Sequence, residues 1–237
     1  MKRKMEYHNP VLLKETVAGL NIKPDGIYVD VTFGGGGHSK EIMKHLGPNG
    51  KLFGFDQDTD ALANAIDDER FVLINENFRF IKRFLRFHGV KQVDGILGDF
   101  GVSSHQFDVA DRGFSTRFDA ALDMRMNQND TLSAYEVVND YEESELKRVF
   151  VDFGELKNGG AMANVIVAAR ADMKIKNSEQ LKEDLSRFLP GHKANKILEE
   201  MRNEIANWRT VAKEFGISNI EIELTKRAFR LVESSIM

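Results

Sequence analysis

A short apolar run, a turn and then a helical pattern follow one another repeatedly between residues 24 and 99, and this alternation limits the possible folds more than any other feature. The apolar runs have the length and the β-branched and aromatic content of buried strands, and they cover residues 26–32, 51–55, 71–74 and 93–97. Helical patterns lie between them at residues 38–46, 59–66 and 78–87. Strands that alternate with helices form parallel sheets, so we predict an α/β fold for this part of the chain.

The strand patterns fade after about residue 130, and helical patterns replace them. We predict helices at residues 132–138, 143–150, 161–171, 178–188, 194–215 and 218–233. Ser218 and Glu221 form a capping box that begins the last of these. A chain of 237 residues is long enough for one domain or for two small ones. We therefore predict an α/β domain over residues 1–130 and an all-helical domain over residues 131–237.

The composition excludes several classes of protein. The chain has no cysteine, which rules out a disulfide framework and a thiolate metal site, and we assign no metal ligands. No stretch approaches the roughly 18 apolar residues of a membrane helix, and no signal-peptide core follows the basic start, so we expect a cytoplasmic protein. The net charge of −4 means that any RNA-binding surface must be local, because phosphate binding needs an excess of lysine and arginine on the contacting face.

Four consecutive glycines, Gly34–Gly37, lie between the first strand and the first helix, where open parallel sheets bind ligands. Their lack of side chains lets a ligand touch the backbone. A dinucleotide-binding pattern starting at Gly34 would place its third glycine at residue 39, which is Ser39, and the lysine of a phosphate-binding loop is absent. Asp56 follows the second strand, where a carboxylate can accept hydrogen bonds from ribose hydroxyls. The glycines alone could be an ordinary turn and the acid alone a helix cap, but together they favour S-adenosylmethionine, which has no phosphate.

The most specific pattern follows the fourth predicted strand. It consists of Asp94-Gly-Ile-Leu-Gly-Asp99-Phe-Gly-Val-Ser-Ser-His-Gln106-Phe-Asp108, then Arg112-Gly-Phe-Ser115, then Leu122-Asp-Met-Arg-Met126. Earlier motifs are His8-Asn-Pro-Val-Leu-Leu13, Asp30 with the glycine turn, Asp56-Gln-Asp58 and Asn77-Phe78. Together they resemble the bacterial small-subunit (16S) ribosomal RNA cytosine-N4 methyltransferase H family, over about residues 6–196.

The resemblance implies a Rossmann-like class I methyltransferase fold and transfer of a methyl group from S-adenosylmethionine to the N4 of a cytidine in small-subunit ribosomal RNA. The substrate partner would be that RNA or the assembled subunit. The family's cofactor positions match Gly36, Gly37, His38, Asp56, Phe78, Asp99 and Gln106. Asp56 would bind the ribose, Phe78 would lie against the adenine, and Asp99 would be the catalytic residue. A carboxylate beside a sulfonium stays ionised, so Asp99 would orient the amine by hydrogen bonding rather than remove its proton before attack.

Structural interpretations of these residues remain open at this point. Phe78 could be a core residue that starts an aromatic stripe, Asp99 a solvated strand end, and Gln106 an ordinary loop residue. Histidines such as His8 and His38 are more often hydrogen-bonded structural residues than catalysts, so we assign neither an acid or base role.

A basic stripe lies on the predicted helix at residues 78–87. Its cations recur at helical spacing, opposite the phenylalanines at positions 80, 84 and 87, and another follows; they are Arg79, Lys82, Arg83, Arg86 and Lys91. Such a stripe can contact RNA, although most are simply solvated faces.

The chain also departs from the family pattern. His105 stands where the family usually has proline, and Ala120-Ala121 where it has Gly-Pro; we expect both on the substrate side of the cleft. Residues 197–237 are expected not to match the family, so the sheet would be incomplete after strand four, with an open edge covered by the helical tail, a partner or a second copy. The alternative to an active enzyme is therefore a shortened, catalytically impaired homologue that binds S-adenosylmethionine or RNA without turnover.

Overall fold

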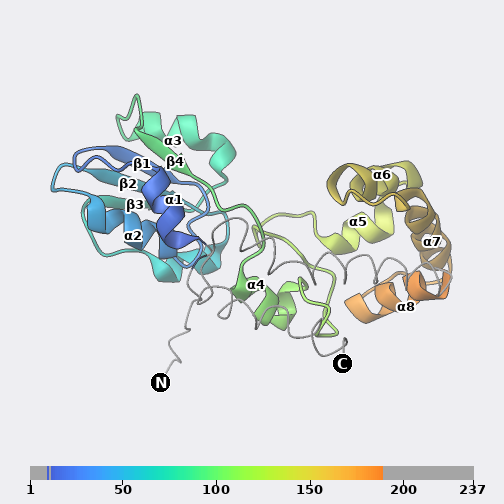
Figure 1. Cartoon of the computed structure of the whole chain (residues 1–237). Coiled ribbons are helices and arrows are strands. Elements are labelled where there is room, and N and C mark those ends of the chain that lie inside the picture. The colour runs from blue at the N-terminus through green and yellow to red at the C-terminus, as the bar shows by residue number, and fades with distance from the viewer. Residues whose placement is uncertain (1–9, 11, 189–237) are drawn as a thin grey trace, which may run out of the picture. The chain divides into compact units, whose positions relative to one another are not determined.

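The computed structural model describes residue 10 and residues 12–188, and within it the chain forms two compact units (Figure 1). Of the described residues, unit 1 contains those up to Glu142 and residues 174–179, and unit 2 contains residues 143–173 and 180–188. The helices predicted at residues 194–215 and 218–233 lie outside the described residues. The assignment of residues 1–130 and 131–237 to two domains stays a prediction.

Unit 1 is built on a four-stranded parallel sheet with the strand order β3-β2-β1-β4. The strands are β1 (Ile27–Asp30), β2 (Lys51–Phe55), β3 (Phe71–Ile74) and β4 (Gly95–Leu97). Each lies within a run predicted from the sequence, and β2 and β3 have the predicted bounds. The order is that of the first four strands of a Rossmann-like sheet, so the α/β prediction is confirmed.

The helices of unit 1 include both predicted and unpredicted ones. The predicted crossover segments are α2 (Gly37–His45), the 3-10 helix η1 (Thr59–Asn64), and the 3-10 helix η2 (Phe78–Phe80) followed by α3 (Ile81–Phe87). The unpredicted ones are α1 (Leu13–Gly19), α4 (Ser104–Asp108) and the 3-10 helix η3 (Ala110–Arg112). Unpredicted helices of this length carry too few apolar positions to produce a periodic pattern.

Helix α5 (Ala134–Asp140) belongs to unit 1, which ends after Glu142. The Tyr135 amide donates a hydrogen bond to the Leu122 carbonyl (2.7 Å), and the side chain of Asn139 exchanges hydrogen bonds with the backbone of Ile175 (2.8 and 2.9 Å). These bonds hold α5 and residues 174–179 in unit 1.

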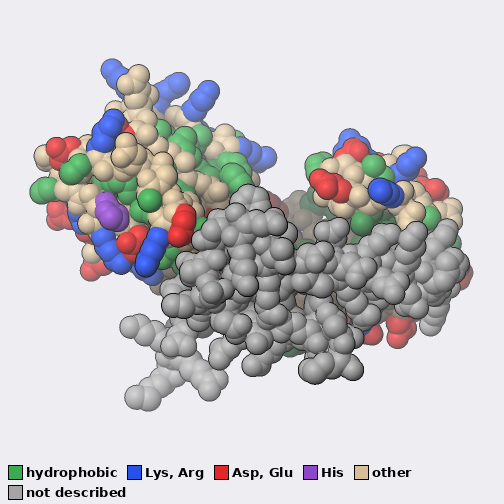
Figure 2. Space-filling view, viewed as in Figure 1, with side chains coloured by type: hydrophobic (Ala, Val, Ile, Leu, Met, Phe, Trp, Pro, Cys, Tyr) green, Lys and Arg blue, Asp and Glu red, His purple; other side chains and the backbone are tan. Residues whose placement is uncertain are grey.

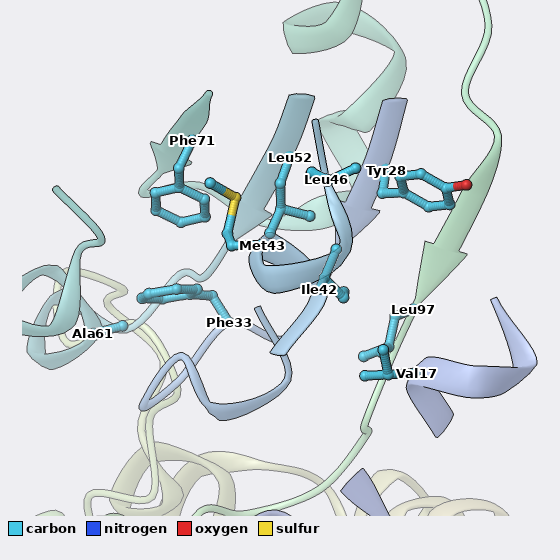
Figure 3. Packing of buried hydrophobic residues seen from close by; sticks show 10 residues of the cluster. All are labelled: Val17, Tyr28, Phe33, Ile42, Met43, Leu46, Leu52, Ala61, Phe71 and Leu97. Atoms are coloured by element: carbon cyan, nitrogen blue, oxygen red, sulfur yellow. The ribbon is translucent and has the colours of Figure 1, made fainter. Parts of the chain in front are cut away.

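The sheet of unit 1 is packed on both faces. Tyr28 and Leu52 point to one face, where they join side chains of α1 and α2 in the cluster that Figure 3 shows. Val29 and Phe53 point to the opposite face and pack with Leu85 of α3. Side chains alternate across a strand, so burial on both faces explains why the strands read as continuous apolar runs in the sequence.

Unit 2 contains α6 (Glu143–Arg148), a single π-helical turn η4 (Val149–Phe153) and α7 (Gly159–Asp172). Leu146 of α6 and Ile166 of α7 are fully buried. The predicted helix at residues 178–188 is α8 (Ser178–Phe188), which begins in unit 1. Among the described residues, no helix is both long and apolar enough to span a membrane.

Candidate active site

A cavity of about 660 Å³ lies where the strands of unit 1 end. Its wall is formed by residues that follow all four strands: residues 31–35 after β1, 56–58 after β2, 76–78 after β3 and 99–103 after β4. Since the strands are parallel, their carboxyl ends meet at this one edge, which is the usual ligand site of open α/β sheets.

The glycine turn, Gly34–Gly37, leads from β1 into α2. Gly34 and Gly36 have φ angles of 49° and 73°, a region that favours glycine. A Cβ atom on Gly36 would lie 2.9 Å from the ring of Phe33, whereas one on Gly34 would meet only a backbone oxygen at 3.9 Å. Gly34 and Gly37 line the cavity, but Gly36 is buried. The backbone atoms of the turn are therefore accessible to a ligand in the cavity.

Asp56 ties the glycine turn to the end of β2. One carboxylate oxygen accepts the Gly34 N–H (2.7 Å), and the other accepts the Asp58 N–H (2.9 Å). Burial raises the pKa of Asp56, against the opposing effect of these hydrogen bonds. A carboxylate has about four lone-pair sites, so Asp56 can still accept bonds from hydroxyl groups in the cavity.

Next to Asp56, the buried carboxylate of Asp58 forms an ion pair with the buried guanidinium of Arg112 (2.7 Å). Gln106 donates to the same Asp58 oxygen (2.8 Å), and Arg112 also bonds Asp60 (2.8 Å). Burial by itself raises the pKa of Asp58, but the hydrogen bonds from Gln106, the Asp60 amide and Arg112 outweigh it, and the pKa lies below its ordinary value. This network joins the end of β2 to the segment that follows β4.

Asp99 follows β4 and has a different environment. Its backbone N–H donates to the hydroxyl oxygen of Thr32 (2.7 Å), whose own amide donates to the fully buried Asp30 (3.0 Å). Ser39 also donates to Asp30 (2.7 Å), and burial raises the pKa of Asp30. The backbone of Asp99 is therefore fixed, while its side chain is exposed at the cavity.

Two aromatic rings stand at the cavity, Phe78 after β3 and Phe100 after β4, with centroids 5.6 Å apart and tilted. Phe78 is 40% exposed and Phe100 is 70% exposed. The interpretation of Phe78 as a core residue is therefore wrong, and both rings present apolar surface that a planar ligand could cover.

His38, in the first turn of α2, also lines the cavity. It is buried, and within the described part of the chain its Nε2 atom has no hydrogen-bond partner. Buried polar atoms are nearly always paired in proteins, so this nitrogen is available to a polar group of a ligand.

Most of the residues expected at the cofactor site line this one cavity. The residues that do so are Gly37, His38, Asp56, Phe78, Asp99 and Gln106. Gly36 does not line it, because it packs beneath the ring of Phe33. Gln106 lines the cavity, but its side chain already has partners within the protein, because it forms a capping box with Ser103 and donates a hydrogen bond to Asp58.

Sequence reasoning missed the role of Arg112. Its position in the Arg112-Gly-Phe-Ser motif was the only available signal, and a motif does not reveal that Asp58, distant along the chain, is its partner. Of the departures from the family pattern, His105 lines the cavity and lies 3.2 Å from the Asp60 carboxylate. Ala120 and Ala121 do not line it, because they pair with residues 177 and 178.

Comparison with known proteins extends the likeness beyond the motifs. Residues 5–233 match the model of the MraW methylase family. The expectation that residues 197–237 depart from the family is therefore wrong, since the match continues to residue 233.

The chain is also similar to proteins named ribosomal RNA small subunit methyltransferase H. It is 66% identical to the one from Flavobacterium johnsoniae over 226 residues, which are 94% of this chain and 75% of the relative. It is 48% identical to the one from Bacteroides thetaiotaomicron over 217 residues, which are 90% of this chain and 71% of the relative. The family match and these identities lead to one conclusion: this chain belongs to the MraW methylase family and has its class I methyltransferase fold.

Proposed function

We propose that this protein transfers a methyl group from S-adenosylmethionine to the N4 of a cytidine in small-subunit ribosomal RNA. The observation that carries the proposal is the cavity where the glycine turn, Asp56 and Asp99 meet, in a chain that belongs to a methylase family. The names of the relatives support the RNA substrate. Since ribosomal RNA is cytoplasmic in bacteria, we propose that address for the enzyme.

The residues of the cavity suit S-adenosylmethionine. Asp56 has remaining acceptor sites for the two ribose hydroxyls, and the backbone at Gly34 leaves room for the methionine part. The unpaired Nε2 of His38 supplies a polar contact, and the exposed face of Phe78 suits the adenine. Gln106 acts mainly by holding Asp58 in place beside them. We assign cofactor binding to these residues and to Gly36 and Gly37, which shape the turn. Asp99 is the remaining residue expected at the cofactor site, and we assign its side chain to the substrate amine.

The bound sulfonium supplies an activated methyl donor. The cytosine amine is a poor nucleophile, so the protein must hold it in line with the methyl carbon. We assign this task to Asp99, whose exposed carboxylate accepts a hydrogen bond from the amine. The N4 lone pair then forms the new bond to carbon while the carbon–sulfur electrons stay on sulfur, and the amine proton leaves by way of Asp99 or water. The target base must leave its stack to reach this position, as in other base-modifying enzymes.

The open edge of the sheet belongs to this proposal as well. Within the described residues β4 is an edge strand, and Ile96 is 54% exposed on it. Exposed apolar edge strands are normally covered, so we propose that the rest of the chain, a partner or a second copy covers this one. Light scattering of the purified protein measures whether a dimer forms.

The decisive test is transfer of a tritiated methyl group to small subunits from cells that lack the cytosine modification. Label should appear in the RNA, and mass spectrometry of the nucleosides should find N4-methylated cytidine. Subunits that already carry the modification are the control and should take up no label. Saturable S-adenosylmethionine binding without any label would instead support the homologue that binds without turnover.

A further inference from the structure

Helix α3 and the short η2 before it carry an exposed basic surface that lies outside the lining of the cavity. One side of α3 packs on the core through Ile81, Phe84 and Leu85. The opposite side is exposed, and we call it the α3 face; it consists of Arg79, Lys82, Arg83, Arg86 and Phe87. The predicted phenylalanine stripe is therefore split, because Phe84 joins the core while Phe87 points to solvent.

The charge of the α3 face is strongly one-sided. No acidic residue occurs between Glu76 and Asp94 in the sequence, and Lys91 adds another exposed cation. Asp94 itself is paired with Lys23 (2.8 Å). Within the described part of the chain, the cations of the α3 face form no salt bridge, whereas arginines elsewhere, such as Arg70, pair with acids. Figure 2 shows basic side chains gathered where Figure 1 places α3. In a protein of net charge −4, such a local excess of positive charge favours binding of a polyanion.

Aromatic side chains lie among these cations. Phe87 is 82% exposed, the largest exposure of any large apolar side chain in the described residues, and it stands one helical turn from Arg83. The guanidinium of Arg79 lies over the ring of Phe80, 4.6 Å from its centroid. Cations interleaved with exposed rings are the combination that binds single-stranded nucleic acid, since phosphates meet the cations and unstacked bases cover the rings. A duplex keeps its bases stacked inside and would leave Phe87 uncovered.

The α3 face also begins at the rim of the cavity, because Phe78 lines the cavity and Arg79 follows it directly. Resting on the function proposed above, we infer that a single-stranded segment of the ribosomal RNA next to the target nucleotide lies along the α3 face. Lys82, Arg83 and Arg86 bind its phosphates, and one of its bases stacks on Phe87. The strand then leads its neighbouring nucleotide into the cavity.

The test measures binding of a single-stranded oligoribonucleotide that carries the target cytidine and its neighbouring small-subunit ribosomal RNA sequence, and of the same sequence as a duplex, over a series of salt concentrations. Replacing Lys82, Arg83 and Arg86 together by glutamine should lower the magnitude of the salt slope by about 2, since single strands lose about 0.7 per phosphate contact. Phe87→Ala should weaken binding of the single strand about fivefold or more and leave binding of the duplex unchanged.

Matched variants separate charge from fold. The double variant Arg83→Lys with Arg86→Lys keeps the charge and should keep the salt slope, and Lys51→Gln with Lys157→Gln removes exposed cations elsewhere and should change nothing. Calorimetry with S-adenosylmethionine checks that each variant retains its cavity. Wild-type affinity and slope in the triple variant would overturn the inference. So would a loss of binding to phosphatidylserine vesicles with RNA binding unaffected, which would mark a membrane surface. Failure of the proposed function is distinct, because wild type would then transfer no methyl group whatever the RNA binding shows.

Discussion

The carboxyl ends of β2 and β4 border the same cavity, but they are built in opposite ways. At the end of β2, both oxygens of Asp56 are engaged by backbone N–H groups, and Asp58 is buried against Arg112. At the end of β4, only the backbone of Asp99 is held, and its side chain and that of Phe100 are exposed. A site for a small cofactor gains from fixed geometry, whereas a site for an incoming base must leave space. The difference supports our proposal that the β2 end binds the cofactor and that the β4 end serves methyl transfer.

The sharpest test of this division is Asp99→Asn, which keeps the size of the side chain and removes its charge. We expect methyl transfer to fall by about 10²-fold or more, because the amine is no longer held in line, while S-adenosylmethionine affinity stays at the wild-type value. Single-turnover transfer and calorimetry measure the two quantities. An equal loss in both would show that the β4 end also binds the cofactor.

Arg112→Met tests the opposite side of the comparison, the rigidity of the β2 end. The change leaves the buried carboxylate of Asp58 without its cation, which typically costs about 3–5 kcal/mol of unfolding free energy. Urea denaturation measures the loss. Arg117→Gln is the matched control, since Arg117 pairs with Asp108 at the surface and its removal should leave the midpoint unchanged. Equal midpoints in both variants would contradict a structural role for the buried pair.

Asp56→Asn should weaken binding of S-adenosylmethionine by about tenfold or more, because bonds from hydroxyls to a carboxylate are stronger than those to a neutral amide. The amide NH₂ group cannot accept an N–H bond, so the variant keeps at most one of the two bonds that Asp56 accepts, from Gly34 or from Asp58. Calorimetry gives the affinity. Unchanged affinity would remove Asp56 from the cofactor site.

The smallest effect that we expect is on the stability of the protein at acidic pH. The pKa of Asp58 is lowered in the folded protein, so the stability that this group contributes is complete above its ordinary pKa of 3.8 and is lost as the pH falls through the lower folded value. Wild type should therefore lose unfolding free energy more steeply below about pH 5 than Asp58→Asn does, because only wild type has this proton to take up. Urea denaturation from pH 6 to pH 3 compares the slopes. Parallel curves would show that Asp58 is not the group concerned.

The strands and the cofactor turn were predictable because their signals are local. Residues 51–55 and 71–74 are apolar runs bounded by turns, and these are the bounds of β2 and β3. Asp56 follows such a run directly, so its place at the sheet edge follows from parallel topology alone. Helix α4 was missed because it is only five residues long. Its capping box, Ser103 with Gln106, is a sequence signal that could have indicated where it begins.

The sequence by itself determined the positions of the strands along the chain, the position of the glycine turn and the family, since these depend on the order of residues along the chain. Only the tertiary structure decided which carboxylates are buried, that Arg112 pairs with Asp58, and that Phe87 faces solvent while Phe84 joins the core. The physical reason is that burial and ion pairing depend on what distant segments bring to the same place, and no local pattern records those neighbours.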